Sequence, residues 1–406
     1  MIDARLAGLK VLVVEDHPFQ RRALVRVLHG LGVARVSEAE DGSHALRCLA
    51  AGAETFDTVI TDLDMPSIDG MALMREIGRM APQVSIILLS AVEREVLGAV
   101  EWLAREQHIN LAAALAKPVS AATLRAALAR AAPARSARKA TMTPASIEAI
   151  AAGLAAGQFE AFLQPKLRFS DGCIAGGEAL ARWRHPDLGW VAPAAFIPAI
   201  ETSELIEPFS LAIVESLAWA VRWMESSGLP GRIAFNASPA WLDQPAMAEG
   251  LFRTIARLGL PVGRLTVEVT EGVSYGDFGV VMENLARLRM RGFMLSVDDY
   301  GTGYSSLGRL VRSPFSELKL DGSFVSDLEP GTPHCFVVES TIELARKLGL
   351  STVAEGIETA NEWELLKNAG CDFGQGYFIA KPMGRSDFMQ WAGRRMQAFS
   401  PAAVAA

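Results

Sequence analysis

Five acidic side chains and one asparagine end short apolar runs in the C-terminal part of the chain, and this pattern limits the folds that it can adopt. They are Glu178, Asn236, Glu268, Asp298, Asp299 and Glu355. Carboxylates that converge repel one another unless cations lie among them or some of them stay protonated. Stability alone does not call for such a cluster, so the pattern predicts a metal-dependent enzyme.

The apolar runs after Pro144 alternate with helical patterns, which is typical of a (β/α)₈ barrel. The eight runs end near Gln164, Glu178, Asn236, Glu268, Asp298, Lys319, Glu355 and Gln375. The C-terminal strand ends of such barrels carry the active site. We therefore expect these polar side chains to converge at one end of a barrel.

The first 131 residues show the alternation of strand and helix that is typical of an open parallel sheet. The predicted strands are Lys10–Val14, Thr58–Thr61, Ser85–Leu89 and Ala113–Ala116, and the predicted helices include Phe19–Leu31 and Ala121–Ala131. The predicted fold class is α/β. A flavodoxin-like doubly wound domain (1–131) is followed by a linker rich in Ala, Arg and Pro (132–145), a TIM-like barrel (146–393) and a C-terminal tail (394–406).

Composition argues against several classes of protein. The net charge is −7, and no run of Lys or Arg suggests binding to DNA. No apolar run is long enough to insert into a membrane, and the first residues lack the layout of a signal peptide. The four cysteines form no CxxC pair, which predicts reduced thiols in a cytoplasmic protein. The six histidines are isolated and are interpreted as structural.

Polar residues at the ends of the N-terminal strands predict a second site. Glu15 and Asp16 follow the first strand, Asp62 ends the strand that begins at Thr58, Ser90 ends the Ile86–Leu89 run, and Lys117 follows the last strand. These ends meet at one edge of a doubly wound sheet. Three carboxylates suit a hard cation such as Mg²⁺, and an aspartate beside that cation can attack a phosphoryl donor.

This N-terminal domain resembles response-regulator receiver domains. The motifs that carry the resemblance are Val14–His17, Ile60–Gly70, Leu88–Ala91 and Leu115–Pro118. The resemblance implies that Asp62 is the phosphoacceptor and that Glu15, Asp16 and the main-chain carbonyl of Asp64 hold Mg²⁺. It also implies that Ser90 and Lys117 are the switch residues, and that a histidine kinase or phosphotransfer protein is a partner.

The receiver-like domain departs from the family at the stretch before Lys117. Ala113–Ala116 lacks the aromatic residue that is usual there, which leaves the route from phosphorylation to output open. A receiver fold retained only for docking or dimerisation is the alternative.

The C-terminal domain resembles EAL-domain phosphodiesterases from about residue 146 to 393. The resemblance rests on Gly177–Pro186, Phe196–Pro198, Val267–Glu271, Asp298–Leu307, Leu318–Asp321, Val353–Thr359 and Gly374–Tyr377. These enzymes open cyclic di-GMP to linear pGpG. No cyclase motif and no DNA-binding helix pair lies elsewhere in the sequence, so synthesis of the dinucleotide and direct gene regulation are not expected.

The resemblance implies two Mg²⁺ or Mn²⁺ ions in the barrel. Their ligands would be Glu178, Asn236, Glu268, Asp298, Asp299 and Glu355, with Asp298 bridging the two ions. Glu355 either binds the second ion through water or acts as general base. Lys319 either orients the attacking water or stabilises charge on the phosphoryl group. Glu178, Lys319 and Glu355 are thus the implied catalytic residues.

The resemblance also assigns groups around the substrate. Arg182 suits a phosphate contact because its planar guanidinium can hold two oxygens. The full implied set is Gln164, Leu180, Arg182, Asp321, Glu358 and Gln375. Glu271 would anchor the loop from Asp299 to Leu307, in which Tyr300 replaces the usual phenylalanine. In the family that loop supports subunit contact, which implies a homo-oligomer, either a dimer or a tetramer. The aromatic residues Trp183, Trp190, Phe196 and Tyr377 are interpreted as core residues, with platforms for base stacking as the alternative.

The sequence therefore predicts a two-component response regulator that hydrolyses cyclic di-GMP to pGpG by two-metal catalysis, under the control of Asp62 phosphorylation. Two alternatives stay open. The barrel could bind the nucleotide as a sensor without hydrolysing it, or the chain could act by competing for a histidine kinase or phosphotransfer protein.

Overall fold

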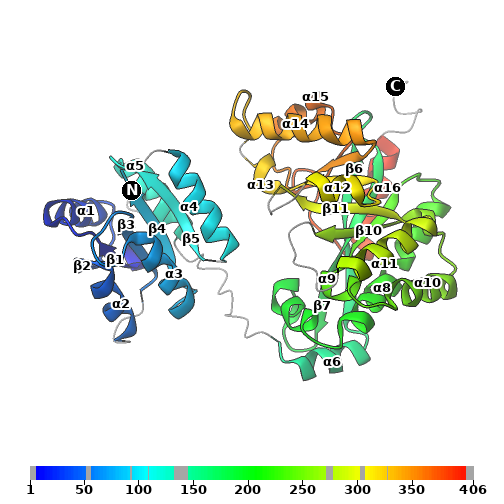
Figure 1. Cartoon of the computed structure of the whole chain (residues 1–406), viewed down its shortest axis with the longest axis horizontal. Helices are drawn as coiled ribbons and strands as arrows, with labels where there is room; N and C mark the ends of the chain where they lie inside the picture. The colour runs from blue at the N-terminus through cyan, green and yellow to red at the C-terminus, as the bar shows by residue number, and fades with distance from the viewer. Residues whose placement is uncertain are drawn as a thin grey trace. The chain divides into compact units, whose positions relative to one another are not determined.

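The computed structural model describes residues 6–51, 56–91, 94–107, 109–131, 145–270, 278–301, 307–326 and 328–398 (Figure 1). The chain divides into two compact units, Met1–Thr141 and Met142–Ala406. Most of the predicted linker, 132–144, lies outside the described residues. Within the described part of the chain, every helix is too short or too polar for a membrane span.

Unit 1 is built on a parallel five-stranded sheet in the order β2-β1-β3-β4-β5, which confirms the flavodoxin-like prediction. The strands are β1 (Lys10–Val14), β2 (Arg35–Ala39), β3 (Thr58–Asp62), β4 (Ser85–Ser90) and β5 (Leu111–Ala116). The helices are η1 (Leu6–Gly8), α1 (Pro18–Gly30), α2 (Gly42–Ala50), α3 (Gly70–Met80), α4 (Arg94–Glu106) and α5 (Ala121–Ala131).

Helices cover both faces of this sheet, which explains why its central strands are apolar throughout. Helices α1 and α5 pack on one face through side chains such as Leu28 and Leu124. Helices α2, α3 and α4 pack on the other face through Ala45, Leu73 and Val100. All five strands run in the same direction, so the polar residues at their carboxyl ends lie at one edge of the sheet.

Unit 2 contains a nine-stranded sheet in the order β6-β14-β13-β12-β11-β10-β9-β7-β8, and an additional pairing of β6 with β7 closes it. The strands are β6 (Phe159–Arg168), β7 (Ile174–His185), β8 (Gly189–Val191), β9 (Arg232–Asn236), β10 (Leu265–Thr270), β11 (Met294–Tyr300), β12 (Glu317–Leu320), β13 (Ser351–Ala354) and β14 (Phe373–Gly374).

Helices surround this barrel in the order expected of a TIM-like fold (Figure 1). They are α6 (Ile147–Ala155), η2 (Pro193–Ala195), α7 (Ile197–Glu201), α8 (Ile206–Ser226), α9 (Pro239–Leu242), α10 (Met247–Leu258), η3 (Val262–Arg264), α11 (Phe278–Met290), α12 (Leu307–Arg312), α13 (Gly322–Val325), α14 (Pro333–Leu348), α15 (Ala360–Ala369) and α16 (Arg385–Ala398). Helix α16 extends past residue 393, where the sequence predicts the start of a tail.

The barrel confirms the predicted (β/α)₈ class, but one strand is reversed. Strand β6 runs antiparallel to both of its neighbours in the ring, β7 and β14. The connection from β6 to β7 spans only residues 169–173, which is too short for the crossover that parallel neighbours need. The two strands therefore form a hairpin, and β8 extends the sheet beyond the ring by pairing with β7.

A buried ion pair lies inside the barrel, on the side away from the carboxyl ends of the parallel strands. Lys166 Nζ is 2.9 Å from Glu317 Oε2 and 3.1 Å from Glu317 Oε1. The Lys166 and Glu317 side chains are only 7% and 9% exposed. Lys166 Nζ also lies 5.3 Å from the ring centre of Phe373. The interior of this barrel is thus partly ionic, in contrast to the branched apolar layers that are usual in TIM barrels.

Candidate active site

Strand register brings the predicted polar residues to neighbouring positions. Glu268 on β10 is level with Asn236 on β9 and with Ser296 on β11. Glu178 on β7 is level with Ala234, two residues before Asn236. The apolar residues that flank Glu268, Val267 and Val269, belong to the core outside the ring. Because side chains alternate along a strand, Glu268 faces the barrel interior.

Lys319 is the centre of the cluster. Its Nζ lies 2.6 Å from Glu355 Oε1, 3.0 Å from Asp298 Oδ1, 3.1 Å from Glu268 Oε1 and 3.5 Å from Glu178 Oε2. None of these four contacts has the geometry of a hydrogen bond, so they are ion pairs at close range. One buried ammonium group is therefore shared by four carboxylates that come from four different strands or strand ends.

The charged groups of this cluster strongly shift one another's pKa values. Burial alone would lower the pKa of Lys319, but the four carboxylates outweigh it and raise that pKa well above 10.5. Burial raises the pKa of Glu268 well above its ordinary value, and burial raises the pKa of Glu355 to about 8. One ammonium group does not balance this many carboxylates, so the cluster favours further positive charge.

A bulge turns two consecutive aspartates toward the site. The register between β11 and β12 shifts between Val297 and Tyr300, and Asp299 has a φ of 53° in the left-handed region. Aspartate tolerates this conformation better than most residues. As a result, carboxylate oxygens of Asp298, Asp299 and Glu355 all lie within 4.8 Å of one another. Burial and the charge of Asp298 raise the pKa of Asp299 to about 6.

Two amides orient the Glu178 carboxylate. Asn236 Nδ2 donates to Glu178 Oε1 at 2.9 Å, and Gln375 Nε2 donates to Glu178 Oε2. Burial alone would raise the pKa of Glu178, but Lys319 and these amides lower it, so this carboxylate stays ionised. Glu178 lies in the middle of β7 and not at its end, because β7 continues beyond the barrel ring to pair with β8.

The donor set fits hard divalent cations. Carboxylate and amide oxygens are the ligands that Mg²⁺ and Mn²⁺ prefer. Glu268 Oε2 is buried and has no hydrogen-bond partner, which is costly for a carboxylate oxygen unless a cation binds it. The oxygens of Asp298, Asp299 and Glu355 are already close enough together to share one ion.

A cavity of about 590 Å³ opens beside the cluster. It shares Asn236 and Leu180 with the predicted site, and its apolar wall includes Phe209 on α8. Glu201 and Asp243 add carboxylates to its lining, and burial raises the pKa of Glu201. This cavity could not be predicted from the sequence, because its lining comes from separate segments with no shared spacing.

The other predicted substrate contacts lie around the strand ends in different settings. Arg182 Nη1 donates to the Ala181 carbonyl at 2.8 Å, and its guanidinium lies 5.7 Å from the ring centre of Phe162. Gln164 Nε2 donates to the Ala380 carbonyl at 3.2 Å. Asp321 accepts from the backbone N–H of Ser323 at 2.9 Å and caps α13.

Glu358 and Glu271 are the remaining predicted residues. The backbone N–H of Glu358 donates to Glu362 Oε2 at 2.7 Å, which belongs to the capping box of α15. Glu271 and most of the loop that it is predicted to anchor lie outside the described residues.

The interpretation of four aromatic residues as core is half right. Trp183 is 2% exposed and stacks on Phe159 at 5.1 Å, and Phe196 is fully buried. Trp190 and Tyr377 are 50% and 57% exposed, so for these two the interpretation is wrong. Trp190 lies on β8, the edge strand outside the ring, where only one face is covered.

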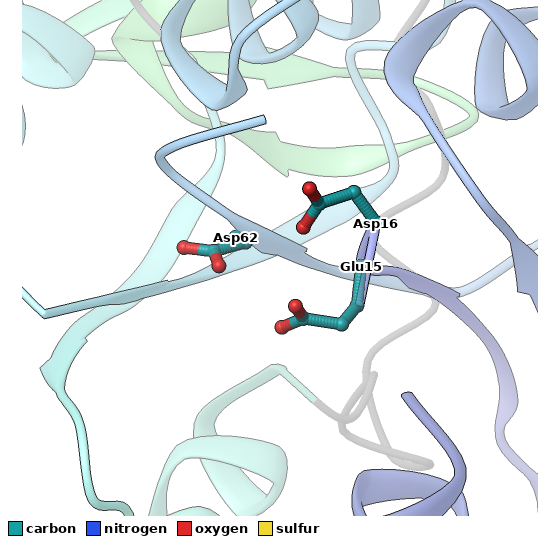
Figure 2. A group of neighbouring side chains, drawn as sticks. All are labelled: Glu15, Asp16 and Asp62. Atoms are coloured by element: carbon teal, nitrogen blue, oxygen red, sulfur yellow. The ribbon is translucent and has the colours of Figure 1, made fainter. Parts of the chain in front are cut away.

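The second predicted site forms in unit 1. Carboxylate oxygens of Glu15, Asp16 and Asp62 lie within 4.8 Å of one another, and Figure 2 shows the three side chains gathered at the ends of β1 and β3. Lys117 Nζ donates to Asp62 Oδ2 at 2.6 Å and to Glu15 Oε2 at 2.8 Å. Burial alone would lower the pKa of Lys117, but Asp62 and Glu15 raise it above 10.5. Ser90 is buried at the end of β4, at the same edge.

Two residues of α1 complete this edge, and the motif pattern did not indicate them. Gln20 Oε1 accepts from Lys117 Nζ at 3.0 Å. Arg21 Nη1 donates to the Glu15 carbonyl at 2.7 Å, and Arg21 Nε donates to Glu38 Oε2 at 3.2 Å. Arg21 therefore links Glu15, which follows β1, to Glu38 on β2. Their position in the first turn of a helix that starts beside Asp16 was the available signal.

Known proteins are similar to this chain in both domains. The response regulator receiver domain model matches residues 11–129, and the EAL domain model matches residues 147–382. The cyclic di-GMP phosphodiesterase RocR of Pseudomonas aeruginosa is 34% identical over 386 residues, which cover 94% of this chain and 98% of RocR. The cyclic di-GMP phosphodiesterase PA2567 of the same species is 38% identical over 237 residues, which cover 58% of this chain and 40% of PA2567.

A solved structure matches the barrel. The PaMucR phosphodiesterase in its c-di-GMP complex aligns with a TM-score of 0.56 and 32% identity, covering 60% of this chain and 98% of that one. The EAL model alone covers more than half of the chain, and the RocR match spans both domains. The chain therefore belongs to the EAL domain family, in the form that carries an N-terminal response regulator receiver domain.

Proposed function

We propose that this chain hydrolyses cyclic di-GMP to linear pGpG in its EAL barrel and that phosphorylation of Asp62 controls this reaction. The observation that carries the proposal is the buried cluster of four carboxylates around Lys319, beside a cavity of about 590 Å³. RocR, which is similar over nearly its whole length, is a cyclic di-GMP phosphodiesterase. PaMucR, similar over the barrel, was solved with c-di-GMP bound.

The ligands for two cations follow from the geometry and the family. Glu178, Asn236, Glu268 and Asp298 would hold one Mg²⁺ or Mn²⁺, and Asp298 and Asp299 would hold the other, with Glu355 reaching it through a bound water. Two such ions, when bound, would offset the charge of the carboxylates and of the substrate phosphate, and would lower the pKa of an attacking water.

Lys319 and Glu355 are the groups that would handle that water. Glu355 Oε1 and Lys319 Nζ are 2.6 Å apart, so one water oxygen can contact both groups. Glu355 would accept the proton of the attacking water, while Lys319 would hold the water or a phosphoryl oxygen in place. The new bond forms between the water oxygen and phosphorus, the P–O bond to the 3′ oxygen breaks, and the leaving oxygen takes a proton. The products are a free 3′ hydroxyl and a 5′ phosphate.

The cavity would receive one guanosine half of the substrate. Leu180 and Phe209 offer apolar surface to a base, while Glu201 and Asp243 can accept hydrogen bonds from the N–H edge of guanine. Arg182, on the strand that carries Glu178, would bind the substrate phosphate. This lining favours a guanine dinucleotide over an adenine one, because adenine lacks the N1–H and N2–H₂ donors.

A substrate panel tests this assignment. Purified protein with Mg²⁺ is incubated separately with cyclic di-GMP, cyclic di-AMP and cyclic GMP, and the products are separated by chromatography. We expect pGpG from cyclic di-GMP and at least about 10³-fold slower turnover of cyclic di-AMP, because adenine cannot present the adjacent N1–H and N2–H₂ donors of guanine to the cavity. Equal rates on both dinucleotides would contradict the guanosine assignment.

Phosphorylation is expected to depend on one carboxylate. Asp62 would attack acetyl phosphate with help from Mg²⁺ held by Glu15 and Asp16, and Lys117 would bind the transferred phosphoryl group. Asp62→Asn should therefore abolish the mass increase that acetyl phosphate produces in the intact protein. It should also abolish any change in cyclic di-GMP turnover that acetyl phosphate causes.

Glu76→Gln is the matched control for this experiment, because Glu76 is a carboxylate on the adjacent helix α3 whose side chain is 43% exposed. It should be phosphorylated as the parent protein is. Phosphorylation of Asp62→Asn at the parental level would show that another residue is the acceptor.

A further inference from the structure

A buried serine, Ser296, lies directly beside the proposed metal ligands. Ser296 lies on β11, two residues before Asp298. Its neighbours Leu295 and Val297 belong to the hydrophobic clusters outside the ring. Because side chains alternate along a strand, Ser296 faces the barrel interior, as Asp298 does.

Strand register places Ser296 beside Glu268. The two residues are level with each other in the parallel pairing of β10 and β11. Both face the interior, so their side chains are direct neighbours on one surface. On its other side, Ser296 is level with Glu317, whose carboxylate is already held by Lys166.

The polar atoms of these neighbours are both unpaired. Ser296 is 0% exposed, and its Oγ has no hydrogen-bond partner. Glu268 is 1% exposed, and its Oε2 also has none, whereas its Oε1 lies 3.1 Å from Lys319 Nζ. Buried polar atoms almost always have partners, so two unpaired atoms at adjacent positions point to a contact that forms when the site binds its cation.

We propose that Ser296 is a positioning residue for the metal site: its hydroxyl donates to the Glu268 carboxylate, directly or through one buried water, when a cation binds. The hydroxyl is a donor and the carboxylate oxygen an acceptor, so the pair is chemically complementary. Glu317 is a weaker candidate because the Lys166 ammonium contacts both of its oxygens. Ala234, which with Asn236 flanks the site on β9, offers no side-chain hydrogen bond.

The contact would act on Glu268 in two ways. It would fix the direction in which the carboxylate faces the cation, and it would favour the ionised form that a cation requires. Hydrogen bonds of this kind to metal ligands typically change metal affinity by about 10–100-fold. This inference rests on the proposed function, because it assumes that the barrel binds divalent metal.

Metal binding can be measured independently of catalysis. Mn²⁺ is titrated by calorimetry into the full-length protein carrying Asp16→Asn, which removes a ligand of the receiver site, and into the same protein carrying Ser296→Ala as well. We expect the second protein to bind Mn²⁺ about tenfold more weakly or worse. Without metal, its melting temperature should equal that of the parent, because the lost hydroxyl has no partner in that state. Ser296→Thr, which keeps the hydroxyl, should restore affinity.

Thr58→Ala is the matched control, because Thr58 also carries a buried, unpaired hydroxyl but lies at the start of β3 in unit 1. It should leave Mn²⁺ affinity of the barrel unchanged. Parental affinity in Ser296→Ala would overturn the positioning role, as would a loss accompanied by a lower metal-free melting temperature that Ser296→Thr does not repair. If the parent itself bound no Mn²⁺ in the barrel, the proposed function would fail instead.

Discussion

Glu178→Gln is expected to reduce turnover of cyclic di-GMP by roughly 10³-fold or more at saturating Mg²⁺, because the loss of a proposed metal ligand would remove several kcal/mol of charge stabilisation. Glu178 accepts hydrogen bonds from Asn236 and Gln375 and lies 3.5 Å from Lys319 Nζ. Glutamine keeps the size of the side chain but removes its negative charge. It also brings an N–H group toward two side-chain amides that already donate.

The measurement is the initial rate of pGpG formation, together with the melting temperature of each variant. Glu215→Gln is the matched control, because Glu215 is a carboxylate on α8 whose side chain is 45% exposed and pairs with Arg257. It should retain the parental rate. A Glu178→Gln protein that melts normally and retains more than about a tenth of the parental rate would show that Glu178 is not a metal ligand.

Glu317→Ala is expected to lower the free energy of unfolding of the barrel by about 3–5 kcal/mol. The change would leave the Lys166 ammonium buried without its counter-ion, since both oxygens of Glu317 contact Lys166 Nζ at 2.9–3.1 Å. Desolvating an unpaired charge costs far more than an exposed ion pair contributes. Chemical denaturation followed by circular dichroism measures the difference.

Two further variants distinguish the energetic cost of an unpaired buried charge from the cost of losing a contact. Glu343→Ala breaks an exposed pair with Lys347 on α14 and should change the free energy of unfolding by less than about 1 kcal/mol. Lys166→Met combined with Glu317→Leu removes both charges and should recover most of the stability lost in Glu317→Ala. If the double variant were as unstable as the single one, packing and not the unpaired charge would account for the loss.

The sequence was sufficient to predict which strand ends bring the polar residues of the candidate site together. Each polar residue, such as Glu268 or Lys319, interrupts an apolar run, and parallel strands bring their ends together whatever the details of packing. The receiver edge could be predicted for the same reason: Glu15, Asp62 and Lys117 follow strands whose order is set by the doubly wound topology.

Features that depend on pairing or on tertiary contact could not be predicted. The reversal of β6 depends on the short 169–173 connection, and an apolar run carries no direction. The edge strand β2 (Arg35–Ala39) has only one buried residue, so it lacks the apolar run that marks the inner strands. In the sequence, Lys166 and Glu317 each look like a solvated charge. They lie 151 positions apart, and no local pattern indicates that they form a pair.

The bulge at Asp298 and Asp299 is another feature that could not be predicted from the sequence. Consecutive residues of a regular strand face opposite sides, so the sequence alone does not explain how both carboxylates reach one site. The positive φ of Asp299 and the register shift against β12 resolve this, and both depend on the neighbouring strand. The exposure of Trp190 also depends on tertiary structure, because its strand β8 lies outside the ring.

We propose that the acidic cluster around Lys319 makes this barrel a metal-dependent phosphodiesterase. The most direct test follows cyclic di-GMP and pGpG over time with the purified full-length protein, first without divalent metal, then after addition of Mg²⁺, and finally after addition of EDTA. We expect pGpG to form only after Mg²⁺ is added, and we expect EDTA to stop its formation. Tight binding of cyclic di-GMP with no pGpG at any concentration of Mg²⁺ or Mn²⁺ would contradict this proposal and would indicate a nucleotide sensor.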